Sequence, residues 1–562
     1  MLRNKILNIS PPNFTLQNIL VDKLGISRIM AQVLINRQVR SVEEAESFLS
    51  AQTSGLLDPY SFLDMHKACG IIRSAAQKKK KILLFGDYDV DGITSVVILK
   101  NALEHLGISA MHYIPHRINE GYGLNKNSIS FARQKGAGLI ITADCGINSI
   151  EEVKELRRNN IEVIVTDHHE PGAHTLTEAC AVINPKVRGE SYKFRDLAGV
   201  GVAYKLCQAL LEDMLLEELD LVCLGTIADV VPLKGENRVI AREGLLRISD
   251  ARRTGIRALI ESSGLKGKKI NSYFVSYILA PRINSSGRMD SAEASLELLM
   301  SRDRGEADEL AKIIEGHNRQ RQKIESKIMD EAEDIISREI NFKKHKVIVL
   351  AKEGWHRGVL GVVASKIADK FYRPTIVFSK GEEYCKGSGR SIKNFHLFRA
   401  LGECSDYLLS YGGHSHAVGV VIEKGCIDDF RSKINRLAEE KLRLEDLFPA
   451  LDVDMELKLA DLNEEVISEL DALEPFGTGN PEPLFYSRGL RLKGSPLVLG
   501  RETLKFWVTD GSTVYPAIAF GMSSFKESLK EAGTFELVYT PRFDSWQGNS
   551  SIILETKEIF FR

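Results

Sequence analysis

The sequence has few of the features that mark secreted, disulfide-linked or membrane-bound proteins. Its eight cysteines are scattered and no two form a CxxC pair, which argues against a secreted disulfide framework and predicts reduced thiols. No apolar run approaches the roughly 18 residues that a membrane-spanning helix needs. Residues 1–5 lead into a polar, proline-containing stretch rather than an apolar signal segment. We therefore expect a cytoplasmic protein without a membrane span.

Net charge is also almost absent. The formal charge is −1 at pH 7, so no global field draws the chain to nucleic acids or membranes. Basic residues gather only locally, in the runs 78–81, 266–269 and 343–346, and most such runs are solvated loops. A nucleic-acid enzyme is still allowed, because a negative metal centre can offset a positive groove elsewhere.

Two common catalytic patterns are missing. A dinucleotide site needs Gly-x-Gly-x-x-Gly after its first strand, whereas residues 87–92 read Asp-Tyr-Asp-Val-Asp-Gly. Carboxylates at that point would repel a pyrophosphate. The sequence also offers no candidate Ser/His/Asp triad. These absences leave the acidic residues themselves as the chemistry to explain.

The order of apolar runs predicts an α/β protein of several domains, because 562 residues are too many for one core. Strand-like and helix-like stretches alternate up to about residue 240 and again after residue 346, with a charged helical connector between them. Alternating segments near the C-terminus indicate a small β-barrel. The predicted segments are 1–50 (helical), 51–240 (parallel-sheet α/β), 241–340 (helical region and connector), 341–447 (smaller α/β) and 448–562 (β-barrel).

Three apolar runs in the first α/β segment end in acidic residues. Runs 81–86, 139–143 and 161–166 read as buried parallel strands. Ligands bind at the carboxyl ends of such strands, where the sequence places Asp87, Asp89, Asp91, Asp144 and Asp167-His168-His169. So much negative charge at one edge requires cations. We therefore expect a metal site.

The ligand types suggest which metal and which reaction. Carboxylate oxygens suit Mg²⁺ or Mn²⁺, and the imidazole of His168 favours Mn²⁺. Asp144 and Asp167, from neighbouring strands, are placed to bridge or complete two ions. Asp229 is a further acid in an apolar segment, costly to bury unless paired or metal-bound. Paired ions activate water for displacement at phosphorus, which predicts phosphoester or phosphoanhydride hydrolysis. Alternatively, each aspartate only caps the helix after its strand.

These residues also resemble the motifs of a known family, the DHH phosphoesterases, and within it the branch of single-stranded-DNA-specific exonucleases. The four family motifs correspond to Asp87–Gly92, Ala143–Gly146, Asp167–His169 and Gly225–Asp229. Stretches shared with that branch are 113–117, 120–124, 280–288 and 473–481. The second α/β segment resembles the DHH-associated domain through 354–359, 387–391 and 412–417, and the C-terminal segment resembles an OB-fold.

The resemblance implies a 5′→3′ exonuclease that releases 5′-mononucleotides from single-stranded DNA, in DNA repair and recombination, with two Mn²⁺ or Mg²⁺ ions. It implies catalytic roles for Asp87, Asp89, Asp91, Asp144, His168, His169 and Asp229, with all of these except His169, together with Asp167, as metal ligands. It assigns substrate binding to Arg117, Arg282, Asn284, Arg288, His356, Arg357, Arg373, Ser388, Arg390, Ser391, His414 and His416. The partners implied are a single-strand-binding protein and a RecQ-type helicase, and we expect a monomer.

The chain departs from the family at Phe85, where many DHH proteins have a histidine that phenylalanine cannot replace as a ligand. In the C-terminal segment, the candidates for base stacking are Phe506, Trp507, Tyr515, Tyr539, Phe543 and Trp546. Strand alternation places Phe506 and Trp507 on opposite faces, so at most one is buried in the barrel.

Two alternatives remain open on the sequence. One is a DHH enzyme for short oligonucleotides or cyclic dinucleotides, although such relatives generally lack the 473–481 motif and the β-rich tail. The other is a catalytically dead DNA-binding scaffold, as in the replication-helicase relative. Such proteins lose metal-binding acids, whereas every motif acid is present here.

Overall fold

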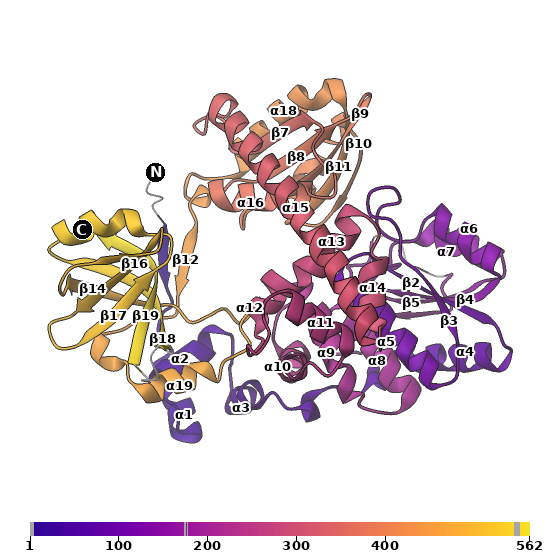
Figure 1. Cartoon of the computed structure of the whole chain (residues 1–562), viewed down its shortest axis with the longest axis horizontal. Helices are drawn as coiled ribbons and strands as arrows, with labels where there is room; N and C mark the ends of the chain where they lie inside the picture. Colours follow the sequence, from indigo (N-terminus) through magenta and orange to yellow (C-terminus); the bar gives the residue numbers. More distant parts are fainter. Residues whose placement is uncertain (1–4, 173–175, 177, 545–550, 562) are drawn as a thin grey trace. The chain divides into compact units, whose positions relative to one another are not determined.

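The computed structural model describes residues 5–172, 176, 178–544 and 551–561. Within these described residues there are two compact units, one made of the described parts of 58–229 and 244–449, the other of 5–57, 230–243, 450–544 and 551–561. Figure 1 shows both units and labels many of their helices and strands. Among the described residues, no helix is long and apolar enough to cross a membrane.

The first unit begins with a five-stranded parallel sheet in the order β3-β2-β4-β5-β6. The three predicted strands are β2, β4 and β5, and they lie next to one another. The strands are β2 (Lys81–Gly86), β3 (Ala110–Tyr113), β4 (Ala137–Ala143), β5 (Glu162–Thr166) and β6 (Ala181–Ile183). The helices of this part are α4 (Met65–Gln77), α5 (Val90–His105), α6 (Lys126–Lys135), α7 (Ile150–Arg158) and α8 (Gly199–Leu211). All three acidic loops therefore start from one edge of the sheet.

Phe85, the departure from the family pattern, belongs to the core of this part. Its side chain is fully buried, lies in the apolar cluster formed by β2, β4 and β5 with α6 and α7, and stacks on Tyr113 at a ring-centroid distance of 5.8 Å. Position 85 therefore contributes packing.

A helical region follows the sheet and continues into one long helix. Its helices are α9 (Leu219–Ala228), α10 (Gly235–Asp250), α11 (Thr254–Ser262), α12 (Ser272–Phe274), the π-helical turn η4 (Val275–Leu279), α13 (Ala280–Met289), α14 (Glu293–Met300) and α15 (Arg304–Glu339). Helix α15 has 36 residues, which corresponds to about 54 Å at 1.5 Å per residue. It packs against α11, α13 and α14 and, further along, against α16. The predicted connector is thus one continuous helix.

The last part of the first unit is a smaller α/β layer with a mixed sheet, β10-β11-β9-β8-β7. Only β7 and β8 run parallel. Its strands are β7 (Ile348–Glu353), β8 (Thr375–Lys380), β9 (Tyr384–Arg390), β10 (Leu408–Gly413) and β11 (Ala417–Glu423), and its helices are α16 (Leu360–Phe371), α17 (Leu397–Gly402) and α18 (Ile427–Lys441). One apolar cluster joins the sheet to α17 and α18, another joins it to α15 and α16.

The second unit contains a closed β-barrel. Strands β14, β18, β19, β17 and β16 pair in that order, and β16 pairs again with β14, which closes the ring as an OB-fold does. The strands are β13 (Met455–Glu456), β14 (Phe485–Leu492), β15 (Leu497–Leu499), β16 (Thr503–Thr509), β17 (Val514–Ala519), β18 (Phe535–Asp544) and β19 (Ser551–Phe561). The other elements are β1 (Ile6–Ile9), which pairs with β12 (Ala450–Val453), and the helices α1 (Phe14–Leu24), α2 (Arg28–Asn36), α3 (Val42–Ser50), α19 (Glu464–Asp471) and α20 (Lys526–Glu531).

The candidate stacking aromatics divide between the inside and the outside of the barrel. Phe506 and Tyr539 are fully buried, whereas Trp507 is half-buried on the other face of β16, with the Lys505 ammonium 5.8 Å from its ring. The predicted alternation at 506 and 507 is therefore confirmed. Tyr515 and Phe543 are half-buried, and Trp546 lies outside the described residues.

Buried hydrogen bonds from Asn480 and Arg238 hold the 473–481 motif in place within the second unit. Asn480 donates from Nδ2 to the carbonyls of Leu473 and Pro475, and it accepts at Oδ1 from Arg37. The fully buried Arg238 donates to the carbonyls of Leu473 (2.8 Å) and Phe48 (2.6 Å). Burial lowers the pKa of Arg238 to about 9. One guanidinium thus joins α3, α10 and the segment before the barrel.

We expect Arg238→Met to destabilise the second unit by about 3 kcal/mol, because it leaves buried carbonyl acceptors without their donor. Denaturant unfolding measures this change. Arg242→Met is the matched control, since Arg242 donates to the carbonyls of Leu49 and Ser50 at a more exposed position. Equal destabilisation by the two substitutions would contradict a specific stabilising role for the buried hydrogen bonds of Arg238.

Candidate metal centre

The loop after β2 is shaped by helix capping as well as by its acids. Asp89 is the N-cap of α5, and its Oδ1 accepts from the N–H of Gly92 at 3.1 Å. A Cβ at position 92 would lie 2.5 Å from the Asp87 carbonyl oxygen, so the tight turn requires glycine there. The capping role that we considered as an alternative is therefore present at Asp89, beside any metal role.

Asp91 reaches a second helix far along the chain. Its side chain is buried, and its two oxygens accept from the N–H groups of Gly199 and Val200, both at 2.7 Å, at the start of α8. A Cβ at Gly199 would lie 2.5 Å from Asp144 Oδ1. The start of α8 thus positions Asp91 directly and leaves room for Asp144.

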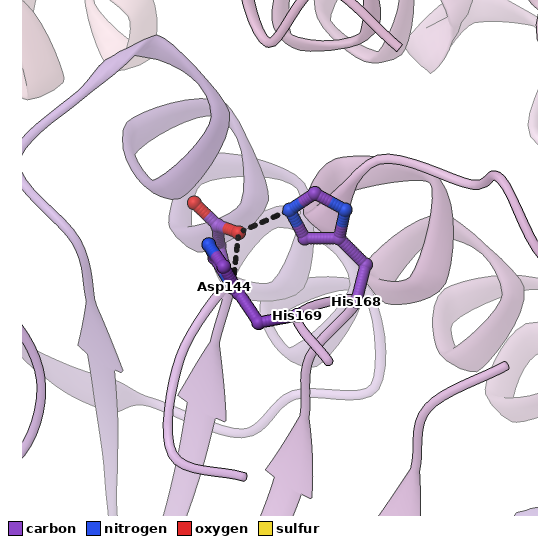
Figure 2. A group of neighbouring side chains, drawn as sticks. All are labelled: Asp144, His168 and His169. Atoms are coloured by element: carbon purple, nitrogen blue, oxygen red, sulfur yellow. Dashed lines mark ion pairs between the residues drawn. The ribbon is translucent and has the colours of Figure 1, made fainter. Parts of the chain in front are cut away.

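Asp144, His168 and Asp229 meet around one imidazole nitrogen. His168 Nε2 lies 3.2 Å from Asp144 Oδ1, 3.5 Å from Asp229 Oδ2 and 3.8 Å from Asp91 Oδ2. Figure 2 shows His168 and His169 converging on Asp144. These atoms of Asp144, His168 and Asp229, with Asp87 Oδ1, are buried and have no hydrogen-bond partner among the described residues. Such atoms in one place are the expected signature of a cation site.

Asp167 lies behind this cluster and orients it. Its carboxylate accepts from the N–H groups of Ile147, His168 and His169 and from the ring Nδ1 of His169 at 2.7 Å. Three of these bonds end on Oδ1 and one, from Ile147, on Oδ2. Within the described chain, the groups of residues that can hold a metal ion do not include Asp167.

Three overlapping ligand groups emerge from this geometry. In each group the ligand atoms lie within 4.8 Å of one another. The groups are Asp87, Asp89 and Asp144; Asp91, His168 and Asp229; and Asp144, His168 and His169. The first two share no residue. The donor sets, carboxylates alone in the first and carboxylates with imidazole in the second, suit Mg²⁺ or Mn²⁺.

Burial and mutual repulsion raise the pKa values of the acids in the cluster. Burial, followed by the charge of Asp89, raises the pKa of Asp87 well above its usual range and that of Asp91 to about 7. Burial, followed by the charge of Asp91, raises the pKa values of Asp144 and Asp229 well above their usual range. Only cations or protons relieve this repulsion.

The two histidines have opposite protonation. Burial lowers the pKa of His168 to about 3, which leaves a neutral imidazole that can ligate metal. Burial also acts against the His169 cation, but its hydrogen bond to Asp167 and the surrounding acids prevail and raise its pKa to about 9. A pKa raised in this way favours the protonated, cationic form of His169 at neutral pH.

Three of the predicted substrate-binding arginines gather beside the acids. Burial, then the charges of Arg117, Arg321 and Arg390, lowers the pKa of Arg288 to about 9. Burial and the charge of Arg117 also lower the pKa of Arg390. Arg288 donates to the Gly358 carbonyl at 3.1 Å, and the Arg117 guanidinium lies 4.7 Å from the ring centroid of Tyr88. Guanidinium groups carry forked donors of the kind that pair with carboxylates and phosphates.

The other predicted substrate residues differ in how free their side chains are. Arg357, His414 and His416 are exposed, and His356 Nδ1 is buried without a hydrogen bond in the described structure. Those engaged with protein groups are Arg282 (Glu315, 2.8 Å), Asn284 (Val90 N–H, 3.2 Å), Arg373 (carbonyls of Tyr372 and Leu447, both 2.9 Å), Ser388 (Val418 carbonyl, 3.4 Å) and Ser391 (Phe395 carbonyl, 2.5 Å).

One residue of the cluster was missed by sequence reasoning. The Tyr122 hydroxyl lies 3.1 Å from His169 Nδ1 and donates to the Asp144 carbonyl at 3.2 Å. It belongs to the 120–124 stretch that carries the family resemblance, so the signal was present. No spacing rule, however, relates this loop to Asp144.

Comparisons with known proteins agree with this geometry. Residues 81–226 match the DHH family N-terminal domain, residues 344–440 the DHHA1 domain and residues 453–558 the RecJ OB domain. The chain is 38% identical to the single-stranded-DNA-specific exonuclease RecJ of Bacillus subtilis over 96% of this chain and 69% of that protein. It is 34% identical to the Escherichia coli protein of the same name over 93% and 94%.

Solved structures give the same result. The crystal structure of RecJ in complex with Mn²⁺ from Thermus thermophilus superposes with a TM-score of 0.86 at 29% identity, covering 100% of this chain and 80% of that one. The Mg²⁺ complex of the same protein gives a TM-score of 0.80 at 28% identity, covering 99% and 78%.

Proposed function

Because the chain belongs to the RecJ family of single-stranded-DNA-specific exonucleases, we propose that its acidic cluster hydrolyses the phosphodiester bonds of single-stranded DNA with two divalent cations. The observation that carries the two-ion proposal is the pair of ligand groups without a shared residue, Asp87/Asp89/Asp144 and Asp91/His168/Asp229. When bound, such a cation pair activates water and stabilises the charge that develops at phosphorus. Mn²⁺ and Mg²⁺ both fit these donors.

The residues around the cluster then hold the substrate. The guanidinium groups of Arg117, Arg288 and Arg390 provide forked donors for backbone phosphates. His169 keeps one proton on Nδ1 toward Asp167, and its cationic ring leaves Nε2–H to donate to an oxygen of the scissile phosphate. Arg357, His356 and His414 extend the phosphate contacts from the DHHA1 side. In the other unit, the half-buried Trp507 on the outer face of the barrel offers a ring on which a base can stack.

We further propose 5′→3′ polarity with release of 5′-mononucleotides, action as a monomer, and a place in DNA repair and recombination in the cytoplasm. An enzyme restricted to single strands needs another protein to expose them, which supports cooperation with a RecQ-type helicase and with a single-strand-binding protein. The eight cysteines are all free thiols in the structure, consistent with a reducing compartment.

Digestion of a DNA strand labelled at either end tests this proposal. With Mn²⁺ or Mg²⁺ we expect a 5′ label to appear at once as mononucleotide, whereas a 3′ label stays on long fragments until late, and EDTA stops both reactions. Early release of the 3′ label would reverse the polarity. Tight binding of the strand with no release from either end would favour the scaffold alternative, and activity on dinucleotides alone would favour the short-substrate alternative.

A further inference from the structure

A loop of lysines and two exposed tyrosines form one surface that the catalytic cluster does not use. The loop is the basic run 266–269, which the sequence leaves without a function. Its Lys266, Lys268 and Lys269, together with Arg257, line a cavity of about 340 Å³ beside α11. Glu261 also lines this cavity, 3.5 Å from Lys266, but that lysine side chain remains 79% exposed.

Aromatic rings continue this surface from the lysines onto the next helix. The Lys268 ammonium lies 5.7 Å from the ring centroid of Phe274, whose ring meets Tyr273 edge-on at 6.0 Å. Tyr273 in turn lies 4.9 Å from Tyr277, with the two ring planes 35° apart. The tyrosines are 58% and 69% exposed. Adjacent aromatic side chains that are this open to water form a contiguous patch, and such patches mark binding surfaces.

The tyrosines stand where the helix changes its winding. Tyr277 lies within the π-helical turn η4, between α12 and α13. Turns of this type are rare in proteins, and those that occur are often found at functional sites.

The same helical segment leads to the metal cluster. Asn284, on α13, accepts from the N–H of Val90 at the start of α5, and Arg288 follows one turn later. Seven residues separate Tyr277 from Asn284, roughly 10 Å at 1.5 Å per residue. A polymer held in the active site therefore comes within reach of the tyrosines.

We propose that Lys266, Lys268 and Lys269 with Tyr273 and Tyr277 form an accessory site for single-stranded DNA at a distance from the scissile phosphate. The lysines attract backbone phosphates, and the tyrosine rings stack on unpaired bases. A single strand fits better than a duplex, because paired bases offer no free ring face in mid-helix. This inference rests on the proposed nuclease function and adds a substrate contact to it.

The test compares a long strand with an oligonucleotide too short to span both sites, using the full-length enzyme with Mn²⁺. We expect Tyr273→Ala/Tyr277→Ala to raise KM for the long strand about tenfold, as the loss of a stacked base predicts, with kcat and the short substrate unchanged. Tyr384→Ala, which removes an aromatic side chain 42% exposed on β9, is the matched control.

Lysine substitution gives a second readout that does not depend on activity. For Lys266→Gln/Lys268→Gln/Lys269→Gln, the slope of log affinity against log salt for the long strand falls by about 2, since each lost phosphate contact on a single strand removes about 0.7. Lys343→Gln/Lys344→Gln changes another exposed basic run and leaves the slope unaltered. The tyrosine variant also keeps the wild-type slope.

Wild-type KM and salt slope in both patch variants would overturn the inference and identify the surface as one for another ligand, such as a protein partner. If the wild-type enzyme degrades no single strand at all, the nuclease proposal fails instead. The two failures are therefore distinguishable in one experiment.

Discussion

Asp144→Asn is expected to lower exonuclease activity by at least about 10³-fold, since metal-ion stabilisation of the transition state amounts to several kcal/mol. Asp144 belongs to the ligand group Asp87/Asp89/Asp144, and its Oδ1 lies 3.2 Å from His168 Nε2 of the other proposed group. A change from carboxylate to amide therefore removes one charged ligand and alters the surroundings of a second. The side chain keeps its shape, and the left-handed backbone at this position, with φ of 63°, is one that asparagine also adopts readily.

The same variant is expected to be more stable than the wild type when metal is absent. The amide needs neither a charge nor a bound proton, so it removes the cost of keeping one buried acid among other acids, about 1.4 kcal/mol for each unit by which the pKa is raised. Activity assays in Mn²⁺ and thermal unfolding in EDTA measure the two effects. Glu212→Gln, at an exposed carboxylate, is the control and changes neither. An inactive variant with reduced stability in EDTA would indicate a folding defect rather than a lost ligand.

The metal-free protein is expected to lose stability as pH rises from about 4 through about 7, the pKa of Asp91 in the folded state. Asp87, Asp91, Asp144 and Asp229 have raised pKa values, so the folded state holds protons that the unfolded chain releases near pH 4. Their stabilising contribution is present below the unfolded pKa and is lost as pH rises through the folded one. Each such group changes the free energy of unfolding by about 1.4 kcal/mol per pH unit within its window.

His168 and His169 also contribute to the dependence of the free energy of unfolding on pH. His168, with its pKa lowered to about 3, adds stability as pH rises from 3 to 6.5 and so offsets one of the four acids. His169, with its pKa raised to about 9, loses stability between pH 6.5 and 9. Above pH 6.5 the raised acids and His169 both lower stability as pH rises, so stability falls most steeply there.

Divalent cations replace the protons, so the rise in melting temperature caused by Mn²⁺ should grow with pH. Thermal unfolding with EDTA or Mn²⁺ across this pH range measures the difference, and calorimetry in two buffers detects the protons released on binding. A metal-induced shift that is independent of pH would show that the acids are already ionised in the metal-free protein.

The position of the metal cluster was predictable because it depends on a strong pattern. Buried parallel strands are continuous aliphatic runs, and the acids follow three of them directly, so β2, β4 and β5 bring Asp87, Asp144 and His168 to one edge of the sheet. The alternation at Phe506 and Trp507 was predictable for the same reason. Short-range periodicity fixes these features before any long-range contact is known.

Contacts between distant segments were not predictable. Nothing near Asp91 in the sequence indicates that it caps α8 more than 100 residues later. The arginines at 117, 288 and 390 come from three separate segments, and only family resemblance suggested them. The different roles of His168 and His169 depend on burial and on the position of Asp167. The mixed order of the DHHA1 sheet likewise follows from tertiary pairing that a single-sequence pattern does not encode.

Helix α15 also constrains which mutations this protein can accumulate. It packs on α13 in its first half, where Glu315 pairs with Arg282, and on α16 further along, where Glu325 pairs with Lys366. One residue inserted between these contacts would turn everything beyond it by about 100° and shift it by about 1.5 Å. Arg390 and Gly358 would then leave Arg288. Substitutions along the exposed face of α15 should accumulate freely, whereas insertions and deletions between its contacts with α13 and α16 should not be tolerated.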